Sequence, residues 1–316
     1  MPLAPDATLA DAGEFGLLAE LLPLFPQGEQ VLIGPGDDAA VLRVRTGHVV
    51  VSTDLMVEGR HFRREWSSAA DVGHRAAAQN ISDINAMGGT ATSLTIGVGA
   101  PPDLPAQWVL DLARGFAEEC GEVGASVVGG DLTRADQVVI AVTVLGACTQ
   151  APVVRSGAAP GDVVALAGRQ GWAAGGLAVL GRGFRSPRVL VEAHRRPQPP
   201  YAAGPIAAAA GATAMIDVSD GLLAEAGHLA TASGVAVNVR ADAFDIAEPL
   251  HAVGAALNAD PLQFVLTGGD DHALLATFPD AASVPSGWRV VGEVLEGSGV
   301  TVDGRTHVGS AGWAHF

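Results

Sequence analysis

Hydrophobic and polar positions divide the first half of the chain into segments that are alternately typical of strands and of helices. The helix pattern is clearest at 68–89, where Ser68 and Asp71 stand at the spacing of a capping box and paired glycines end the segment. A second helix pattern covers 104–124, and segments rich in β-branched residues predict strands at 48–54, 92–100, 126–131 and 137–148. This order predicts a mixed α/β domain.

The second half of the chain repeats this alternation after a segment rich in glycine and proline. That segment, 149–162, is the predicted boundary between an N-terminal domain at 1–150 and a C-terminal domain at 151–316. A glycine-rich turn is expected at 168–180, and a loop at 194–205, where prolines lack amide donors. The remaining patterns predict strands at 163–168, 235–241 and 288–295, and a helix that starts at 217–221.

The charge of the chain excludes several classes of protein. The 316 residues carry a formal charge of −16, and all 18 basic residues are arginine. Walker A loops and protein kinases need a lysine that reaches the phosphates, so neither pattern is possible here. Nucleic-acid binding is not expected either, because phosphate backbones are held by basic surfaces. Any phosphate chemistry must depend on metal ions, arginines and backbone amides.

The sequence points to neither a membrane nor a secretory route. Its apolar runs are too short to span a bilayer, and the N-terminus lacks a basic flank followed by a hydrophobic run. Cys120 and Cys148 do not make a disulfide framework, so we expect two small buried thiols in a reducing compartment. These features predict a cytoplasmic protein without membrane contact.

Aspartates gather at predicted turns and strand ends. Asp37 and Asp38 follow a Gly-Pro-Gly turn, and Gly-Gly-Asp occurs at 129–131 and 268–270, each time after a predicted strand. Adjacent carboxylates repel each other, and a hard cation between them removes the conflict. We therefore predict a Mg²⁺ ion that links Asp37 or Asp38 to a polyphosphate. Further aspartates placed at strand ends, on a helix face or at a helix start are Asp54, Asp83, Asp131, Asp217 and Asp220.

Three other features are candidates for binding an anion or a substrate. The helix that starts at 217–221 offers amide donors and a positive dipole end, which suit a phosphate or an anionic cap. Arg155, in the predicted interdomain loop, is either a fixed cation for a ligand or half of a surface salt bridge. His61 either contacts the substrate or is a loop histidine bonded to its neighbours.

Eight separated motifs carry a resemblance to a known family. They are GDDAAV, STDLMVEGRHF, NISDINAMGGTATSL, GGDLTR, RSGAAPGD, IDVSDGL, LTGGDDHALL and GWAHF. In order and spacing they resemble the thiamine-monophosphate kinases, which belong to the superfamily of aminoimidazole ribonucleotide synthetase, selenophosphate synthetase and a hydrogenase-maturation enzyme. The resemblance implies an enzyme that transfers the γ-phosphoryl group of ATP to thiamine monophosphate and gives thiamine diphosphate. It also implies a two-domain α/β fold with mixed sheets, and a homodimer joined through the N-terminal domain with ATP and several Mg²⁺ ions near the interface.

The same resemblance assigns roles to individual residues. It implies catalytic roles for Asp38, Asp54 and Asp220. It implies ATP contacts at Gly130, Asp131, Arg155 and Ser219. It implies contacts with thiamine monophosphate at His61, Asp270 and Trp313, and an indole can stack on the cationic thiazolium. It implies Mg²⁺ ligands at Asp38, Ser52, Thr53, Asp54, Asp83, Asp131, Asp217 and Asp220.

Two stretches depart from the family pattern. The family usually has Gly-Gly-Glu-Asp-Tyr where this chain has Gly-Gly-Asp-Asp-His at 268–272, and an acidic residue with a serine where this chain has Trp172 and Ala173.

The alternative functions are another ATP-dependent enzyme of the superfamily and a non-catalytic Mg-nucleotide-binding module. Selenophosphate synthetases carry a reactive Cys or selenocysteine near the N-terminus, and the hydrogenase-maturation enzyme ends in Cys, whereas this chain has neither feature.

Overall fold

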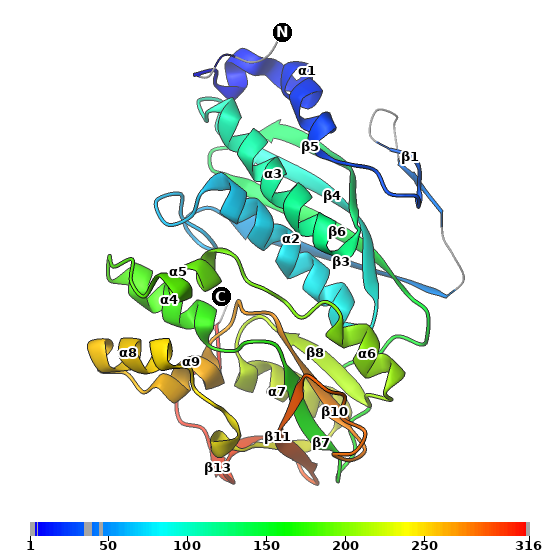
Figure 1. Ribbon diagram of the computed structural model, residues 1–316, viewed down its shortest axis with the longest axis vertical. Helices are drawn as coiled ribbons and strands as arrows, with labels where there is room; N and C mark the ends of the chain where they lie inside the picture. The colour runs from blue at the N-terminus through cyan, green and yellow to red at the C-terminus, as the bar shows by residue number, and fades with distance from the viewer. Residues whose placement is uncertain (1–3, 5, 35–39, 44–46, 314–316) are drawn as a thin grey trace. The chain divides into compact units, whose positions relative to one another are not determined.

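The computed structural model describes residues 4, 6–34, 40–43 and 47–313. The chain forms two compact units, each built around its own sheet (Figure 1). Unit 1 comprises Met1–Ile84 and Thr90–Thr149, and unit 2 comprises Asn85–Gly89 and Gln150–Phe316. The short segment Asn85–Gly89 is thus grouped with the second half of the chain although it lies in the first half of the sequence.

Unit 1 contains a four-stranded sheet with the strand order β3-β6-β4-β5. β6 is antiparallel to both of its neighbours, whereas β4 and β5 are parallel and are joined by the crossover helix α3. The elements of the sheet layer are β3 (His48–Val57), α2 (Ala69–Ala86), β4 (Thr90–Ala100), α3 (Ala106–Val123), β5 (Ser126–Arg134) and β6 (Val139–Cys148). They are preceded by α1 (Leu9–Leu21), η1 (Leu22–Leu24), β1 (Val31–Ile33) and β2 (Val41–Leu42).

Helices α2 and α3 lie over one face of this sheet (Figure 1). On that face, Ile140 and Val144 of β6 are completely buried. The two helices approach each other closely at Gly115, where a Cβ would stand 2.0 Å from the carbonyl oxygen of Ala70. A larger residue at Gly115 would therefore push the helices apart.

The opposite face of the same sheet is exposed along its edge strand. Val49, Val51 and Leu55 of β3 alternate with residues that face α2, and they are 52%, 67% and 57% exposed. On this face the exposed Thr53 separates Leu55 from the two valines. Exposed apolar side chains that gather on one sheet face are typical of an interaction surface. We call Val49, Val51 and Leu55 the apolar strip.

Unit 2 contains a seven-stranded sheet with the order β13-β12-β9-β11-β7-β10-β8. β12 is parallel to β9, and the other neighbouring strands are antiparallel. The strands are β7 (Val163–Ala167), β8 (Ala214–Val218), β9 (Ala236–Val239), β10 (Ala273–Phe278), β11 (Trp288–Leu295), β12 (Gly299–Val302) and β13 (Arg305–Thr306). The helices are α4 (Trp172–Gly181), α5 (Arg188–Arg195), α6 (Ala203–Ala209), α7 (Leu222–Ser233), η2 (Ala241–Ala243), α8 (Glu248–Leu257) and α9 (Pro261–Thr267).

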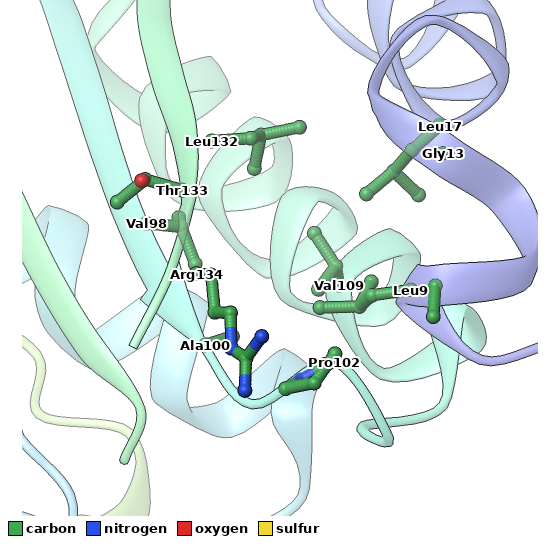
Figure 2. A pocket seen from close by; sticks show the side chains of 11 residues that line it. Leu9, Gly13, Leu17, Val98, Ala100, Pro102, Val109, Leu132, Thr133 and Arg134 are labelled. Carbon is green, nitrogen blue, oxygen red and sulfur yellow. The ribbon is translucent and has the colours of Figure 1, made fainter. Parts of the chain in front are cut away.

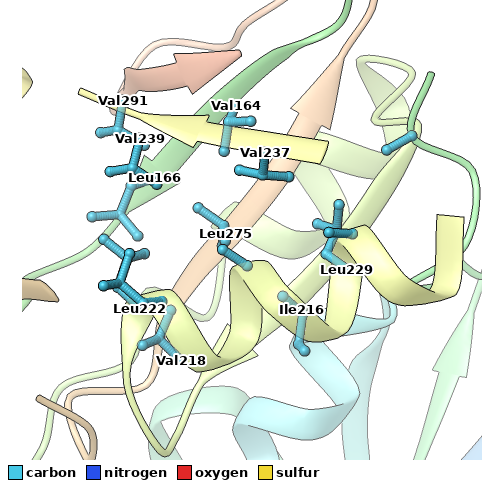
Figure 3. Packing of buried hydrophobic residues seen from close by; sticks show 14 of the residues in the cluster. Val164, Leu166, Ile216, Val218, Leu222, Leu229, Val237, Val239, Leu275 and Val291 are labelled. Carbon is cyan, nitrogen blue, oxygen red and sulfur yellow. The ribbon is translucent and has the colours of Figure 1, made fainter. Parts of the chain in front are cut away.

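Both faces of the central strands of this sheet are buried. Leu222 and Leu229 of α7 pack in one cluster with Ile216 of β8, as Figure 3 shows. The other face carries a second cluster around Phe278, whose ring meets Trp288 edge-to-face at 5.7 Å between ring centres. Burial on both faces explains why β10 is an uninterrupted apolar run apart from one threonine.

The glycine-rich segment 168–180, which was expected to be a turn, contains helix α4. Its glycines serve helix packing, because a Cβ on Gly176 would stand 2.1 Å from the carbonyl oxygen of Leu190 in α5. The proline-rich loop expected at 194–205 is shorter than predicted, since α5 ends within it and α6 begins within it. Close packing between helices therefore outweighs the weak helix propensity of glycine in α4.

The second Gly-Gly-Asp, at 268–270, follows a helix and not a strand as predicted. Helix α9 ends directly before it, and Asp260 begins that helix by accepting the Leu262 backbone N–H at 3.0 Å. The short apolar run 264–266 fits a strand or a buried helix equally well by its pattern. The cap at Asp260, followed by proline at the first helical position, decides for the helix.

Candidate active site

Asp54 and Asp131 lie within strands, and the prediction that they end their strands is wrong. Leu55 still pairs with Ala141 in β6, and Leu132 still pairs within the sheet with β4. These ladder bonds carry β3 to residue 57 and β5 to residue 134. Each aspartate therefore points out of one face of a sheet and not into a turn.

Ser52 and Asp54 of β3 lie on the face that α2 covers. The Ser52 hydroxyl donates a hydrogen bond of 2.6 Å to Asp83 Oδ2 on α2. Asp54 shares this face because alternate residues of a strand point the same way. All three side chains are half-buried. The structure thus brings together a hydroxyl and a carboxylate from two elements and places a second carboxylate on the same face.

These oxygen atoms fit the requirements of Mg²⁺. The ion prefers oxygen ligands, usually takes one or two carboxylates, keeps several waters and completes its shell with phosphate oxygens. Among the residues that the structure describes, no three His, Cys, Asp or Glu side chains form a group that would hold a metal ion by themselves. Asp37 and Asp38, predicted to share a Mg²⁺ ion, lie outside the described residues. The set Ser52, Asp54 and Asp83 therefore suits an ion that is partly held by water and a phosphorylated ligand.

Asp131 lies on the opposite face and the opposite edge of the sheet from Asp54. Residues that pair across neighbouring strands point to the same face of the sheet. Asp131 of β5 pairs with Gly97 of β4. Gly97 pairs in turn with Ala141 of β6, and Ala141 pairs with Leu55 of β3. Leu55 belongs to the exposed face, whereas its neighbour Asp54 faces α2. The edge strands β3 and β5 are also separated by β6 and β4, or about 14 Å at the usual strand spacing. Within one chain, the sheet does not bring these two aspartates together.

Thr53 and Gly130 each have a structural role in this sheet. The Thr53 hydroxyl donates to the carbonyl oxygen of Val142 at 2.8 Å. At Gly130, a Cβ would stand 2.0 Å from the carbonyl oxygen of Ile96 in the neighbouring strand. The close approach of β4 and β5 therefore requires glycine there, whatever the residue contributes to a nucleotide.

Five of the predicted residues in unit 2 come together at the C-terminal end of β8. Asp217 lies in β8, and Ser219 and Asp220 follow it. The carbonyl oxygen of Ser219 accepts the Asp270 N–H at 2.8 Å, and that of Asp220 accepts the Trp313 N–H at 2.9 Å. Main-chain bonds thus join segments that are far apart in the sequence. We call the segments 217–221, 268–272 and 311–313 the loop cluster.

The loop cluster holds two residues in a backbone conformation that is rare outside glycine. Asp270 has φ 65° and His272 has φ 52°. His272 Nδ1 lies 3.1 Å from Asp217 Oδ2, and the His272 N–H donates to Val218 O at 3.2 Å. Strained residues that are held by surrounding bonds are typical of binding and catalytic sites.

Two buried carboxylates of this region, Glu225 and Asp271, are not among the predicted site residues. Glu225 accepts the Gly221 N–H at 2.9 Å, and Asp271 Oδ1 accepts the Ala173 N–H at 3.0 Å at the start of α4. Burial raises the pKa of each carboxyl to about 7. The sequence held a signal for Glu225, because an acidic residue in the first turn of a helix is favoured there. It held none for Asp271, whose partner is distant in the sequence.

Arg155 lies apart from the loop cluster within unit 2, and His61 belongs to unit 1. The carbonyl oxygen of Arg155 accepts a bond from the Ser233 hydroxyl at 3.1 Å, which places Arg155 at the C-terminal end of α7. Ser219 precedes the other end of this helix, whose 12 residues span about 18 Å. His61 belongs to unit 1, and its Nδ1 accepts the Val57 N–H at 3.0 Å, so the neutral ring carries its proton on Nε2.

A small cavity in unit 1 involves none of the predicted site residues. It measures about 180 Å³ and is lined by residues of α1, α3, β4 and β5 (Figure 2). Leu17, Val98 and Leu132 give it an apolar wall, and Arg134 supplies a charge at its edge. An apolar cavity of this size offers little to a phosphorylated ligand.

None of the helices in the described ranges has the length and apolar character of a membrane span. Cys120 and Cys148 are free thiols and both are buried, as predicted. Burial raises the pKa of Cys120 to about 12.

Two family models match the chain. Residues 36–148 match the N-terminal domain of AIR synthase related protein, and residues 159–305 match its C-terminal domain. The predicted mixed α/β fold of two domains is confirmed by these matches.

Curated relatives are similar over nearly the whole chain. A thiamine-monophosphate kinase from Mycobacterium tuberculosis is 47% identical over 312 residues, which cover 98% of this chain and 93% of the relative. A thiamine-monophosphate kinase from Corynebacterium glutamicum is 38% identical over 323 residues, which cover 98% of this chain and 95% of the relative.

Solved structures are similar over the same extent. AaThiL complexed with AMPPCP and TMP superposes with a TM-score of 0.79 at 30% identity, and covers 98% of this chain and 99% of that chain. Thiamine-monophosphate kinase from Stenotrophomonas maltophilia K279a gives a TM-score of 0.78 at 30% identity, with coverage of 92% and 95%. A hydrogenase maturation protein HypE, at 18% identity and a TM-score of 0.67, shares the fold alone.

Proposed function

Because the chain belongs to the thiamine-monophosphate kinase family, we propose that it transfers the γ-phosphoryl group of ATP to the phosphate of thiamine monophosphate, giving thiamine diphosphate. The observation that carries this proposal is 47% identity to a curated kinase over 98% of the chain. The loop cluster supports it, because predicted nucleotide, metal and substrate residues meet there. The compartment we expect for this ATP-dependent enzyme is the cytoplasm.

The reaction requires little covalent help from the protein. The acceptor is a phosphate oxygen that is already anionic at neutral pH, so an in-line transfer needs no strong general base. The protein has to hold both phosphorylated molecules in line and neutralise their charge. We assign Ser219 to the nucleotide, and Asp270 and Trp313 to thiamine monophosphate. The Trp313 side chain is 53% exposed, so its indole is accessible to a thiazolium ring.

We assign the Mg²⁺ ions of the reaction to the oxygen ligands on both units. Ser52, Asp54 and Asp83 would hold an ion in unit 1, where the bond from Ser52 fixes the orientation of Asp83. When bound, Mg²⁺ neutralises charge on the transferring phosphoryl group. The remaining ligands and contacts that we propose from the family resemblance are Asp38, Thr53, Gly130, Asp131, Arg155, His61, Asp217 and Asp220.

We propose that the enzyme is a homodimer joined through the exposed face of the unit 1 sheet. The apolar strip on β3 supports this arrangement, since its three side chains are more than half exposed in the single chain. A second copy on this face would also explain the position of Asp131. This aspartate shares the exposed face but lies at the sheet edge away from β3. A partner chain is what brings other ligands to it.

A coupled assay tests the proposed function. The purified full chain is supplied with ATP, Mg²⁺ and thiamine monophosphate, and with thiamine in a parallel reaction. We expect thiamine diphosphate to form from the monophosphate and no phosphorylation of thiamine. Phosphorylation of thiamine without phosphorylation of thiamine monophosphate would contradict the proposal. ATP binding without turnover of any acceptor would instead favour the non-catalytic module, and turnover of a different acceptor would favour another activity of the superfamily.

A further inference from the structure

We propose that Glu225 is a positioning residue that holds Ser219 and Asp220 in place for the nucleotide and its metal. This inference rests on the function proposed above. Glu225 lies in the first turn of α7, and its side chain is directed back to the residues that precede the helix. The Glu225 side chain is 3% exposed, so it is too buried to contact a nucleotide that binds at the surface of the loop cluster.

The Glu225 carboxylate accepts hydrogen bonds from consecutive residues of the loop cluster. Oε1 accepts the Asp220 N–H at 3.2 Å and lies 3.4 Å from the Ser219 hydroxyl. Oε2 accepts the Gly221 N–H at 2.9 Å. One buried carboxyl group therefore binds two amide donors and a hydroxyl at the positive end of a helix, where negative charge is favoured.

The carbonyl groups of the same residues are held by other segments. Ser219 O accepts the Asp270 N–H and Asp220 O accepts the Trp313 N–H. Glu225 thus holds the amide side of the segment while Asp270 and Trp313 hold its carbonyl side. With both sides fixed, loss of either set of bonds changes where the Ser219 hydroxyl and the Asp220 carboxylate point.

The main chain at Gly221 is closely surrounded by other segments. Gly221 has φ 152°, and a Cβ there would stand 2.7 Å from Thr267 O and 2.9 Å from Ala311 O. The segment is therefore enclosed by its neighbours, and Glu225 holds it through the Asp220 and Gly221 N–H groups and the Ser219 hydroxyl. Residues that orient ligand-binding groups in this way typically change affinity or activity by about 10–100-fold when they are replaced.

A matched control is available in the same unit. Asp162 is also a buried carboxylate, 6% exposed, and its Oδ2 accepts the Ala159 N–H at 3.0 Å and the Thr213 hydroxyl at 2.7 Å. It precedes β7, whereas the loop cluster lies at the other end of that strand, beside the start of β10. Replacing Asp162 disturbs a buried turn of the same kind without touching the loop cluster.

The experiment measures binding of a non-hydrolysable ATP analogue by calorimetry, with Mg²⁺ present, to the full chain. We compare wild type, Glu225→Gln, Glu225→Asp and Asp162→Asn, and record the melting temperature of each. Glu225→Gln keeps the length of the side chain but removes its charge and one acceptor. We expect it to weaken analogue binding about tenfold, Glu225→Asp to recover part of the loss, and Asp162→Asn to bind as wild type does.

The inference is overturned if Glu225→Gln binds the analogue within twofold of wild type, or if Asp162→Asn weakens binding equally. Should Glu225→Gln fail to fold, Glu225→Asp decides in its place: weaker binding than Asp162→Asn supports the inference, and equal binding refutes it. A wild type that binds the analogue but leaves thiamine monophosphate unphosphorylated contradicts the proposed function alone, since the comparison of variants depends only on binding.

Discussion

His272 Nδ1 lies 3.1 Å from Asp217 Oδ2, and both side chains are almost completely buried. The pair joins the start of β10 to the end of β8, two strands that are ladder neighbours. His272 lies in one of the two stretches where the chain departs from the pattern of the family that it resembles. A buried imidazole beside a carboxylate fixes the orientation of that carboxylate, as in many metal sites.

Replacing His272 by phenylalanine is expected to lower the free energy of unfolding by about 1–3 kcal/mol, because Asp217 loses a buried hydrogen-bond partner. If Asp217 is a Mg²⁺ ligand, the Mg²⁺ concentration for half-maximal turnover should also rise about tenfold. Denaturant unfolding and a Mg²⁺ titration check the two effects. His251→Phe, at an exposed position of α8, is the control. Equal stability of the two variants would contradict the role assigned to the pair.

Asp54→Asn is expected to remove most of the turnover at limiting Mg²⁺ while the melting temperature stays near that of wild type. The amide cannot supply the negative charge that Mg²⁺ binding needs, and a half-buried strand residue tolerates an isosteric change. The rate is measured across a range of Mg²⁺ concentrations, with Asp103→Asn, an exposed aspartate of unit 1, as control. Near-normal rates of Asp54→Asn at low Mg²⁺ would show that Asp54 is not a ligand.

Asp271 predicts a pH-dependent contribution to stability. Burial raises the pKa of its carboxyl from 3.8 to about 7 in the folded protein. Between these values the folded chain keeps a proton that the unfolded chain has released, so the stability from this group is complete below about pH 4 and is lost as the pH rises towards 7. The full effect is at most about 4 kcal/mol.

Asp271→Asn should abolish this contribution, because asparagine has no proton to lose and still accepts the Ala173 N–H. Unfolding free energies measured from pH 4 to pH 8 are expected to decline more steeply for wild type than for the variant. Asp162→Asn, a buried aspartate elsewhere in unit 2, is measured in parallel to show the effect of the same substitution away from α4. Parallel curves for wild type and Asp271→Asn would show that the buried carboxyl keeps an ordinary pKa.

Local signals in the sequence were sufficient for much of the fold. The capping box predicted from Ser68 and Asp71 is present, with the Ser68 N–H donating to Asp71 Oδ2 at 3.0 Å and the Asp71 N–H donating to Ser68 Oγ at 3.2 Å. The strands predicted at 92–100 and 137–148 are present as well. Such features depend on residues a few positions apart, which a sequence displays directly.

The arrangement of the site depended on contacts that no local pattern contains. A strand pattern does not show at which residue the hydrogen-bonded ladder ends. For this reason Asp54 and Asp131 were expected at strand ends, whereas the structure places them within strands. The pattern also does not say which face an aspartate occupies relative to another strand, because that depends on register. The burial of Asp271 at this site was not predicted, because its partner Ala173 lies on helix α4, which was expected to be a glycine-rich turn.

The apolar strip predicts through which face two copies of the chain assemble. Val51 is 67% exposed in the single chain and lies between Val49 and Leu55 on the same sheet face. In a homodimer joined through this face, Val51→Asp buries an unpaired carboxylate from each chain, which costs several kcal/mol. The dissociation constant of the dimer should therefore increase by at least about a hundredfold.

Sedimentation velocity over a range of protein concentrations measures this change. Val308→Asp is the control, because Val308 is 94% exposed but belongs to a loop of unit 2 and not to the strip. We expect wild type and Val308→Asp to sediment as dimers and Val51→Asp as a monomer with an unchanged far-UV spectrum. A wild type that remains monomeric, or a Val51→Asp protein that remains dimeric, would exclude this face as the interface. Turnover lost together with the dimer would further support a site whose ligands, among them Asp131, come from two copies of the chain.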